Sequence, residues 1–242
     1  MSFLTKKINM RKLLLIIFLA TSTNLIAQQM GFQVVYIDAE ENSQDNITDI
    51  LDEFYKNNKL KTNGAVALER LWLGRPKGTT HRIAFLWELG NRGFEEGEIT
   101  PDENRAFWSS LINRIDSWAW DKSYAGRFIN FIEGDVEKYP YAQIWDIKPE
   151  NPQSFKDAQM DLVKSLPEVF EDRFVGFGTY DVNRPDGATH WVLVSGKDLD
   201  DHLKFVNDLQ TKHSKTFNKY IEDRGNVELV HNFTFENLRF YK

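Results

Sequence analysis

Two seven-residue segments that lie 109 positions apart decide the fold prediction. The first reads Arg75-Pro76-Lys77-Gly78-Thr79-Thr80-His81, and the second reads Arg184-Pro185-Asp186-Gly187-Ala188-Thr189-His190. Two shorter blocks, Glu41-Asn42-Ser43-Gln44 and Glu150-Asn151-Pro152-Gln153, align at the same offset. Because one offset holds from the first block to the second without a gap, the sequence indicates an internal duplication.

The same order of elements is predicted around these blocks in each half. Each half begins with an apolar run that predicts a strand. Apolar residues at helical spacing follow and predict a helix, for which Asp45 and Ser154 are candidate N-terminal caps. The Arg-Pro-x-Gly segments predict hairpins, since proline fixes one backbone angle and glycine tolerates a positive one. The later elements are the returning strands at 83–87 and 191–194, helices at 103–118 and 199–222, and last strands at 128–132 and 227–235. Strand, helix, strand, strand, helix, strand is the ferredoxin-like order.

The strands are apolar on both sides, as in Phe32-Gln33-Val34-Val35-Tyr36-Ile37 and Trp191-Val192-Leu193-Val194. Such runs are typical of strands buried on both faces, whereas two helices can cover only one face of a four-stranded sheet. The sequence therefore predicts an α+β fold of two tandem ferredoxin-like repeats, packed sheet to sheet as an intrachain pseudo-dimeric barrel. The predicted units are a signal peptide at 1–27, a first repeat at 28–137 and a second repeat at 138–242, in a monomer with internal pseudo-twofold symmetry.

This doubled, two-sided architecture resembles the dimeric α+β barrel superfamily, which includes the antibiotic-biosynthesis monooxygenase-like proteins. The resemblance covers nearly all of the chain after residue 27. It implies a fold but no particular chemistry, because that superfamily includes cofactor-free oxygenases, haem enzymes and isomerase-like proteins. No catalytic motif of the superfamily is present to transfer a residue role.

The N-terminal segment has the layout of a secretory signal peptide. Lys6, Lys7, Arg11 and Lys12 precede an apolar run at 13–20, and small or polar residues follow up to Ala27. The run is short for a membrane span, which needs about 20 apolar residues. We therefore expect export to the periplasm or the medium and no stable membrane insertion after signal removal. An uncleaved anchor is the alternative.

Composition narrows the classes of partner. Removal of residues 1–27, which hold four bases and no acid, lowers the formal charge from −6 to about −10. This disfavours nucleic acid and anionic membranes as partners. The chain has no cysteine, so thiolate chemistry and disulfides are excluded. No phosphate loop, dinucleotide fingerprint or His-Glu-x-x-His motif occurs, and we predict no cofactor and no metal site.

The repeated pairs Thr80-His81 and Thr189-His190 are the most distinctive candidate ligand-binding residues. Strand alternation places both histidines on an apolar face, where a polar side chain needs a partner or a ligand. Three interpretations follow: each imidazole fastens its hairpin, contacts a ligand, or shares a metal across the pseudo-twofold axis. The first is favoured, because no carboxylates stand beside the histidines to complete a metal site.

Further candidates are Arg75, Arg184 and Trp87. The arginines could clamp a carboxylate or phosphate, although their position before a turn proline favours hairpin salt bridges or carbonyl capping. Trp87 is a candidate for the lining of an apolar pocket. The acidic segment 90–98 has no counterpart in the second half and predicts a solvated insertion or a lid. The acids at 198–201 are more typical of a helix start than of a metal site.

Three functions are compatible with these patterns. The favoured one is an exported protein that binds a small apolar or aromatic ligand between sheet and helices. The alternatives are a cofactor-independent monooxygenase or isomerase-like enzyme, with His81 or His190 as general base, and a partner-binding structural module.

Overall fold

The computed structural model describes residues 30–242, which form two halves with a common order of elements. The first half consists of β1 (Met30–Ala39), α2 (Gln44–Asn57), β2 (Ala65–Leu71), β3 (His81–Glu88), α3 (Pro101–Ile112) and β4 (Ile115–Ile132). The second half consists of β5 (Tyr141–Pro149), α4 (Pro152–Ser165), α5 (Pro167–Phe170), β6 (Val175–Val182), η1 (Pro185–Gly187), β7 (His190–Gly196), α6 (Leu199–Thr211), α7 (Ser214–Asp223) and β8 (Val227–Tyr241). The predicted signal peptide lies outside the described residues.

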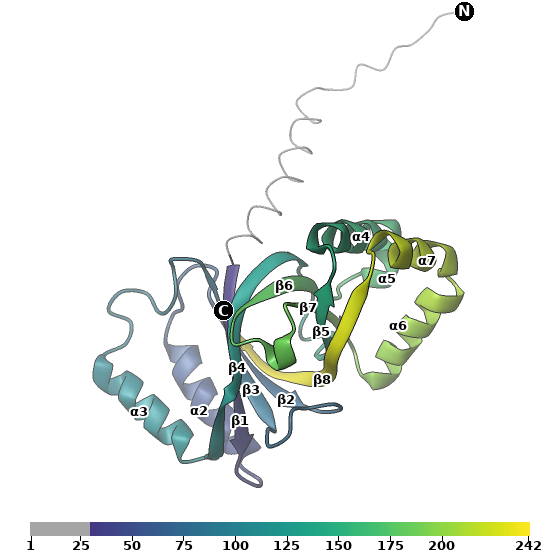
Figure 1. The fold of residues 1–242 in the computed structure, drawn as a ribbon. Helices are drawn as coiled ribbons and strands as arrows, with labels where there is room; N and C mark the ends of the chain where they lie inside the picture. Colours follow the sequence, from purple (N-terminus) through teal and green to yellow (C-terminus); the bar gives the residue numbers. More distant parts are fainter. Residues whose placement is uncertain (1–29) are drawn as a thin grey trace, which may run out of the picture.

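The eight strands form one closed antiparallel barrel in the order β1-β3-β2-β8-β5-β7-β6-β4. Figure 1 shows the barrel between two groups of helices, α2 and α3 on one side and α4 to α7 on the other. Two seams join the halves: β2 pairs with β8 from Val66↔Tyr241 onward, and β4 pairs with β6 from Ala125↔Val182 onward. The predicted α+β barrel is confirmed. Closure also removes the bare strand edges that an open sheet would expose.

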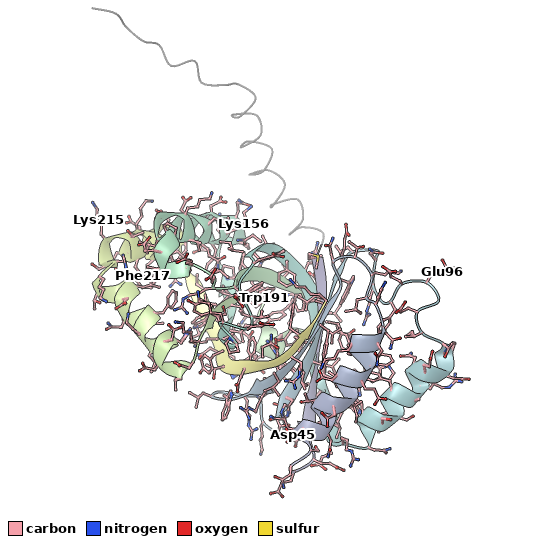
Figure 2. The ribbon with its side chains drawn as sticks, turned by 180° about the vertical axis from the view of Figure 1, so that it is seen from behind. Asp45, Glu96, Lys156, Trp191, Lys215 and Phe217 are labelled. Carbon is pink, nitrogen blue, oxygen red and sulfur yellow. The ribbon has the colours of Figure 1, made fainter. Side chains whose placement is uncertain are left out.

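The two faces of each strand belong to different cores, which explains the continuous apolar runs. On β1, Phe32, Val34 and Tyr36 point into the barrel, whereas Val35 and Ile37 pack under α2 and α3. The barrel core is rich in aromatic rings, and Figure 2 shows Trp191 in its interior. Alternate side chains of a strand point to opposite faces, so both faces of each strand must be apolar.

The outer helices pack by their apolar faces. Ile47 and Leu51 of α2 are fully buried against the first half of the sheet. Helix α3 begins with a capping box, in which Thr100 and Glu103 satisfy each other's backbone N–H groups. No helix within residues 30–242 combines the length and apolar character needed to cross a membrane.

Several predicted boundaries differ from the structure. Helix α3 ends at Ile112 and β4 begins at Ile115, so Trp118 lies in a strand and not in the predicted helix. The predicted helix at 199–222 is divided into α6 and α7. The helix caps are Ser43 and Asn151, not Asp45 and Ser154; the Asn151 side chain accepts hydrogen bonds from two backbone N–H groups. Alternating aromatic residues fit both helical and strand spacing over short windows, which explains the misplaced Trp118.

Candidate functional site

His81 lies in the layer between the first half of the sheet and α2. Its Nδ1 lies 3.0 Å from the Thr80 hydroxyl, which also accepts the Ala39 backbone N–H at 2.8 Å. Its Nε2 lies 3.2 Å from the side-chain oxygen of Gln44, the first residue of α2. Burial, with Arg70 and Arg75 nearby, lowers the pKa of His81 to about 4. The imidazole is therefore neutral near pH 7 and connects the β2–β3 hairpin, β1 and α2.

His190 has a similar position in the second half. Its Nδ1 lies 2.8 Å from the Thr189 hydroxyl, and its ring stacks on Phe177 with centroids 5.3 Å apart. Burial lowers its pKa, and Arg184 acts in the same direction. The backbone contacts of the threonines also match, because Thr80 N–H donates to the Ile37 carbonyl at 2.9 Å and Thr189 N–H to the Ile147 carbonyl at 3.1 Å.

Neither histidine lines any of four cavities that occur within residues 30–242. Arg75 and Arg184 both line one cavity at the end of the barrel where the two hairpins lie. Trp87 lines another, between the first half of the sheet and its helices. The structure thus brings the two repeated arginines together and leaves each histidine in its own half.

A cavity with a mostly apolar lining lies between the second half of the sheet and helices α4, α6 and α7, and we call it the α4–α6–α7 pocket. Its volume is about 360 Å³. The strands contribute Trp145, Ile147, Val175, Val192, Val194, Val227 and Leu229. The helices and their ends contribute Phe155, Gln159, Leu162, Val163, Phe170, Phe205, Val206, Leu209, Phe217, Tyr220 and Arg224. Small-molecule sites are typically cavities of about 300–1,000 Å³ with mostly apolar linings.

Few polar groups line this pocket, and two have unpaired atoms. The side chain of Gln159 is buried, and its Oε1 has no hydrogen-bond partner among the described residues. The same holds for Nε of Arg224, whose guanidinium lies 5.3 Å from the Tyr220 ring centroid. Burial raises the pKa of Tyr220, so its hydroxyl stays protonated. An unpaired buried polar atom costs about 1–3 kcal/mol, which a ligand with a matching group would recover.

A second sheet–helix cavity of about 290 Å³, the α2–α3 pocket, occurs in the first half. Residues 92–94 of the acidic segment 90–98 line it. Lys61 N–H donates to the Gly93 carbonyl at 3.0 Å, and Phe94 stacks on Tyr55 with centroids 5.9 Å apart. The acidic segment has no counterpart in the second half. The two halves are therefore inequivalent at the places where they could bind ligands.

A polar network that was not predicted from the sequence lies inside the barrel. Buried Arg82 pairs with Glu69 and donates to the Tyr124 hydroxyl at 3.1 Å. Burial raises the pKa of Tyr36, whose hydroxyl lies 3.2 Å from that of Tyr124.

The network continues on the opposite wall of the barrel. Tyr180 donates a hydrogen bond to Asp146, and Nδ1 of His231 lies 3.5 Å from the same carboxylate. This contact raises the pKa of His231. In the sequence, this network was indicated only by charged residues within largely apolar strands, such as Asp146 in the run 141–147.

The acidic segment at the start of α6 is accounted for by structural contacts. Asp198 caps the helix, and Asp201 pairs with Arg173 at 2.8 Å. His202 is buried, and its Nε2 lies 2.6 Å from the Gln143 side-chain oxygen. Within residues 30–242, no group of three or more His, Asp or Glu side chains is positioned to hold a metal ion.

The fold is similar to solved structures of low sequence identity. A protein from Lactobacillus acidophilus NCFM, provisionally described as a monooxygenase, has a TM-score of 0.60 at 10% identity, covering 88% of this chain and 96% of that chain. A provisionally described monooxygenase from Fusobacterium nucleatum subsp. nucleatum has a TM-score of 0.57 at 14% identity, with coverages of 88% and 94%. An anthrone oxidase-like protein has a TM-score of 0.51 at 9% identity, with coverages of 88% and 92%.

These similarities show that the α+β barrel fold is shared, and they show no more than the fold. No protein-family model matches the sequence. No curated protein matches it either.

Proposed function

We propose that this chain is an exported protein that binds a small apolar or aromatic molecule in the α4–α6–α7 pocket. One observation supports this most directly: an apolar cavity of about 360 Å³ is lined by a buried glutamine, Gln159, whose Oε1 has no hydrogen-bond partner within residues 30–242. The apolar lining would supply most of the binding free energy by removing ligand surface from water. The Gln159 oxygen would select ligands that carry one hydrogen-bond donor.

The test uses protein purified from cells that express the full chain and titrated with N-phenyl-1-naphthylamine, a neutral aromatic probe with one N–H donor. We expect one saturable site. Val206→Trp fills the pocket from α6 and should weaken binding more than tenfold. Gln159→Leu removes the acceptor and should weaken it about fivefold, since a buried hydrogen bond contributes about 1 kcal/mol.

The matched control is Asn104→Leu, which makes the same kind of change in the α2–α3 pocket and should leave the affinity unaltered. Loss of binding in the control but not in Val206→Trp would move the site to the first half. Probe binding unaffected by all three variants would contradict the proposal.

Export rests on the basic, apolar and small-residue pattern of residues 1–27. We expect the intact mass of the protein recovered from the periplasm or the medium to correspond to a chain that starts at Gln28. Recovery of the full-length mass from the membrane fraction would instead indicate an uncleaved anchor.

We further infer that the two halves, 28–137 and 138–242, arose by duplication. Three observations support this: the shared element order, the matched hairpin sequences and the equivalent hydrogen bonds of Thr80 and Thr189. After duplication, the segment at 90–98 would have covered one pocket and left the other available.

The enzymatic alternative draws support from the descriptions of two structural neighbours as monooxygenases. The general bases predicted for it are less well placed. His81 has hydrogen-bonding groups beside both ring nitrogens, and neither His81 nor His190 lines any of the four cavities. The partner-binding module likewise stays a prediction, and we favour ligand binding.

A further inference from the structure

The two repeated arginines define a second candidate site, at the end of the barrel where both hairpins lie. The cavity there, which we call the rim cavity, has a volume of about 370 Å³. It shares no lining residue with the α4–α6–α7 pocket. Residues of both halves line it, because Arg75 follows β2 and Arg184 follows β6.

Both arginine-bearing loops are fixed to the barrel. On the first hairpin, Trp72 N–H donates to the Thr234 carbonyl at 2.9 Å. Gly74 has a φ of +72°, and a Cβ there would lie 2.4 Å from the Asn232 carbonyl oxygen. On the second hairpin, the Asn183 amide donates to the carbonyls of Asp121 and Ser123 at 2.8 and 2.7 Å. The loop backbones are therefore held in place before any ligand arrives, which lowers the entropic cost of binding.

The cationic side chains of the rim cavity have no anionic partner. Arg75, Lys77, Lys122 and Arg184 line it, and none forms an ion pair within residues 30–242. The Lys122 ammonium donates to the Lys77 carbonyl. The salt bridges and carbonyl capping first favoured for the two arginines are thus not observed among the described residues.

Carboxylates balance this charge only in part. Asp121, Asp146 and Asp186 also line the cavity, which makes three acids against four cationic residues. The third acid, Asp146, accepts from Tyr180 and lies beside His231, whose pKa is raised. The excess of positive charge favours an anionic ligand, and paired guanidinium forks suit a planar carboxylate.

The inner wall of the rim cavity is aromatic. It includes Tyr36, Tyr124 and Phe233, all buried, with the His231 ring stacked 5.7 Å from that of Phe233. A flat apolar group would lose water-exposed surface against these rings. We propose that the rim cavity binds a small aromatic carboxylate, with the carboxylate between Arg75 and Arg184 and the ring against the aromatic wall.

Isothermal titration with benzoate and with acetate tests this proposal at low ionic strength, where exposed charges are least screened. We expect benzoate to bind at one site per chain, and acetate, which lacks the ring, to bind at least tenfold more weakly. Arg75→Gln and Arg184→Gln should each weaken benzoate about tenfold. Both arginines are exposed, so these variants are expected to fold.

The matched control is Arg105→Gln, which removes an exposed arginine that pairs with Asp102 on α3, outside the cavity, and should leave benzoate binding unchanged. Probe binding in the α4–α6–α7 pocket should also persist in Arg75→Gln and Arg184→Gln, whereas Gln159→Leu should retain benzoate binding. The two proposals can therefore fail separately. Absence of saturable benzoate binding, equal affinity for acetate, or full affinity in both arginine variants would overturn the rim-cavity proposal.

Discussion

Replacing Glu69 with leucine is expected to lower the free energy of unfolding by about 3–5 kcal/mol, because it leaves a charged arginine unpaired inside the barrel. The Glu69 and Arg82 side chains are 10% and 3% exposed. Burial raises the pKa of Glu69, although Arg82 beside it acts in the opposite direction. The Arg82 guanidinium also lies 4.2 Å from the Phe235 ring centroid.

Urea denaturation measures this effect. The double variant Glu69→Leu/Arg82→Met removes both charges and should recover most of the lost stability, since well-packed apolar residues often replace a buried ion pair without loss. Asp181→Asn breaks the exposed Arg127–Asp181 pair and, as a control, should cost less than about 1 kcal/mol. A Glu69→Leu protein within 1 kcal/mol of the parent would contradict the assignment of a buried, charged pair.

Acidification from pH 6.5 to pH 4 is expected to destabilise the protein through His81 and His202. Burial lowers the pKa of each histidine from 6.5 to about 4. Arg70 and Arg75 also lower the pKa of His81. Arg173 also lowers the pKa of His202, whereas Asp201 raises it. Because the folded pKa is lowered, the unfolded chain binds the proton first. The contribution of each histidine is complete above pH 6.5 and is lost as the pH falls toward 4, by roughly 3 kcal/mol per histidine.

The measurement is the unfolding free energy as a function of pH. Acidic side chains titrate in the same range, so the informative quantity is the difference between a variant and the parent. His81→Gln and His202→Gln should each lose less stability on acidification. His231→Gln should behave in the opposite way, because Asp146 raises the pKa of His231 and its contribution is lost as the pH rises. A parent and a His81→Gln/His202→Gln variant with parallel pH profiles would refute the assignment.

The architecture could be predicted from the sequence because its signals are local and repeated. The matched hairpins indicated two equivalent halves, and the two-sided strands indicated a second buried face. Trp118 was misplaced because a short aromatic run has no unique period. The polar interior was missed because Glu69, Arg82 and Asp146 lie on three strands and meet only after the barrel closes.

The sequence predicted a ligand position between sheet and helices, which remains a prediction. The α4–α6–α7 pocket itself depends on how α7 packs on α4 and α6, which the sequence does not show. The repeated block pointed to Arg75 and Arg184, which line one cavity. The position of both arginines before a turn proline predicted a role in the hairpins. The sequence does not show that two hairpins 109 residues apart reach one cavity.

Barrel closure has a consequence for the order of folding. The β4–β6 seam joins residues such as Ala125 and Val182, whereas the β2–β8 seam joins Val66 to Tyr241, near the end of the chain. Contacts so distant in sequence form slowly, because the entropy of closing a long loop is lost before the contacts can compensate. During synthesis, β2 therefore keeps an unpaired edge until residues 227–241, which form β8, have emerged. That interval is when a binding chaperone would protect this protein most from aggregation.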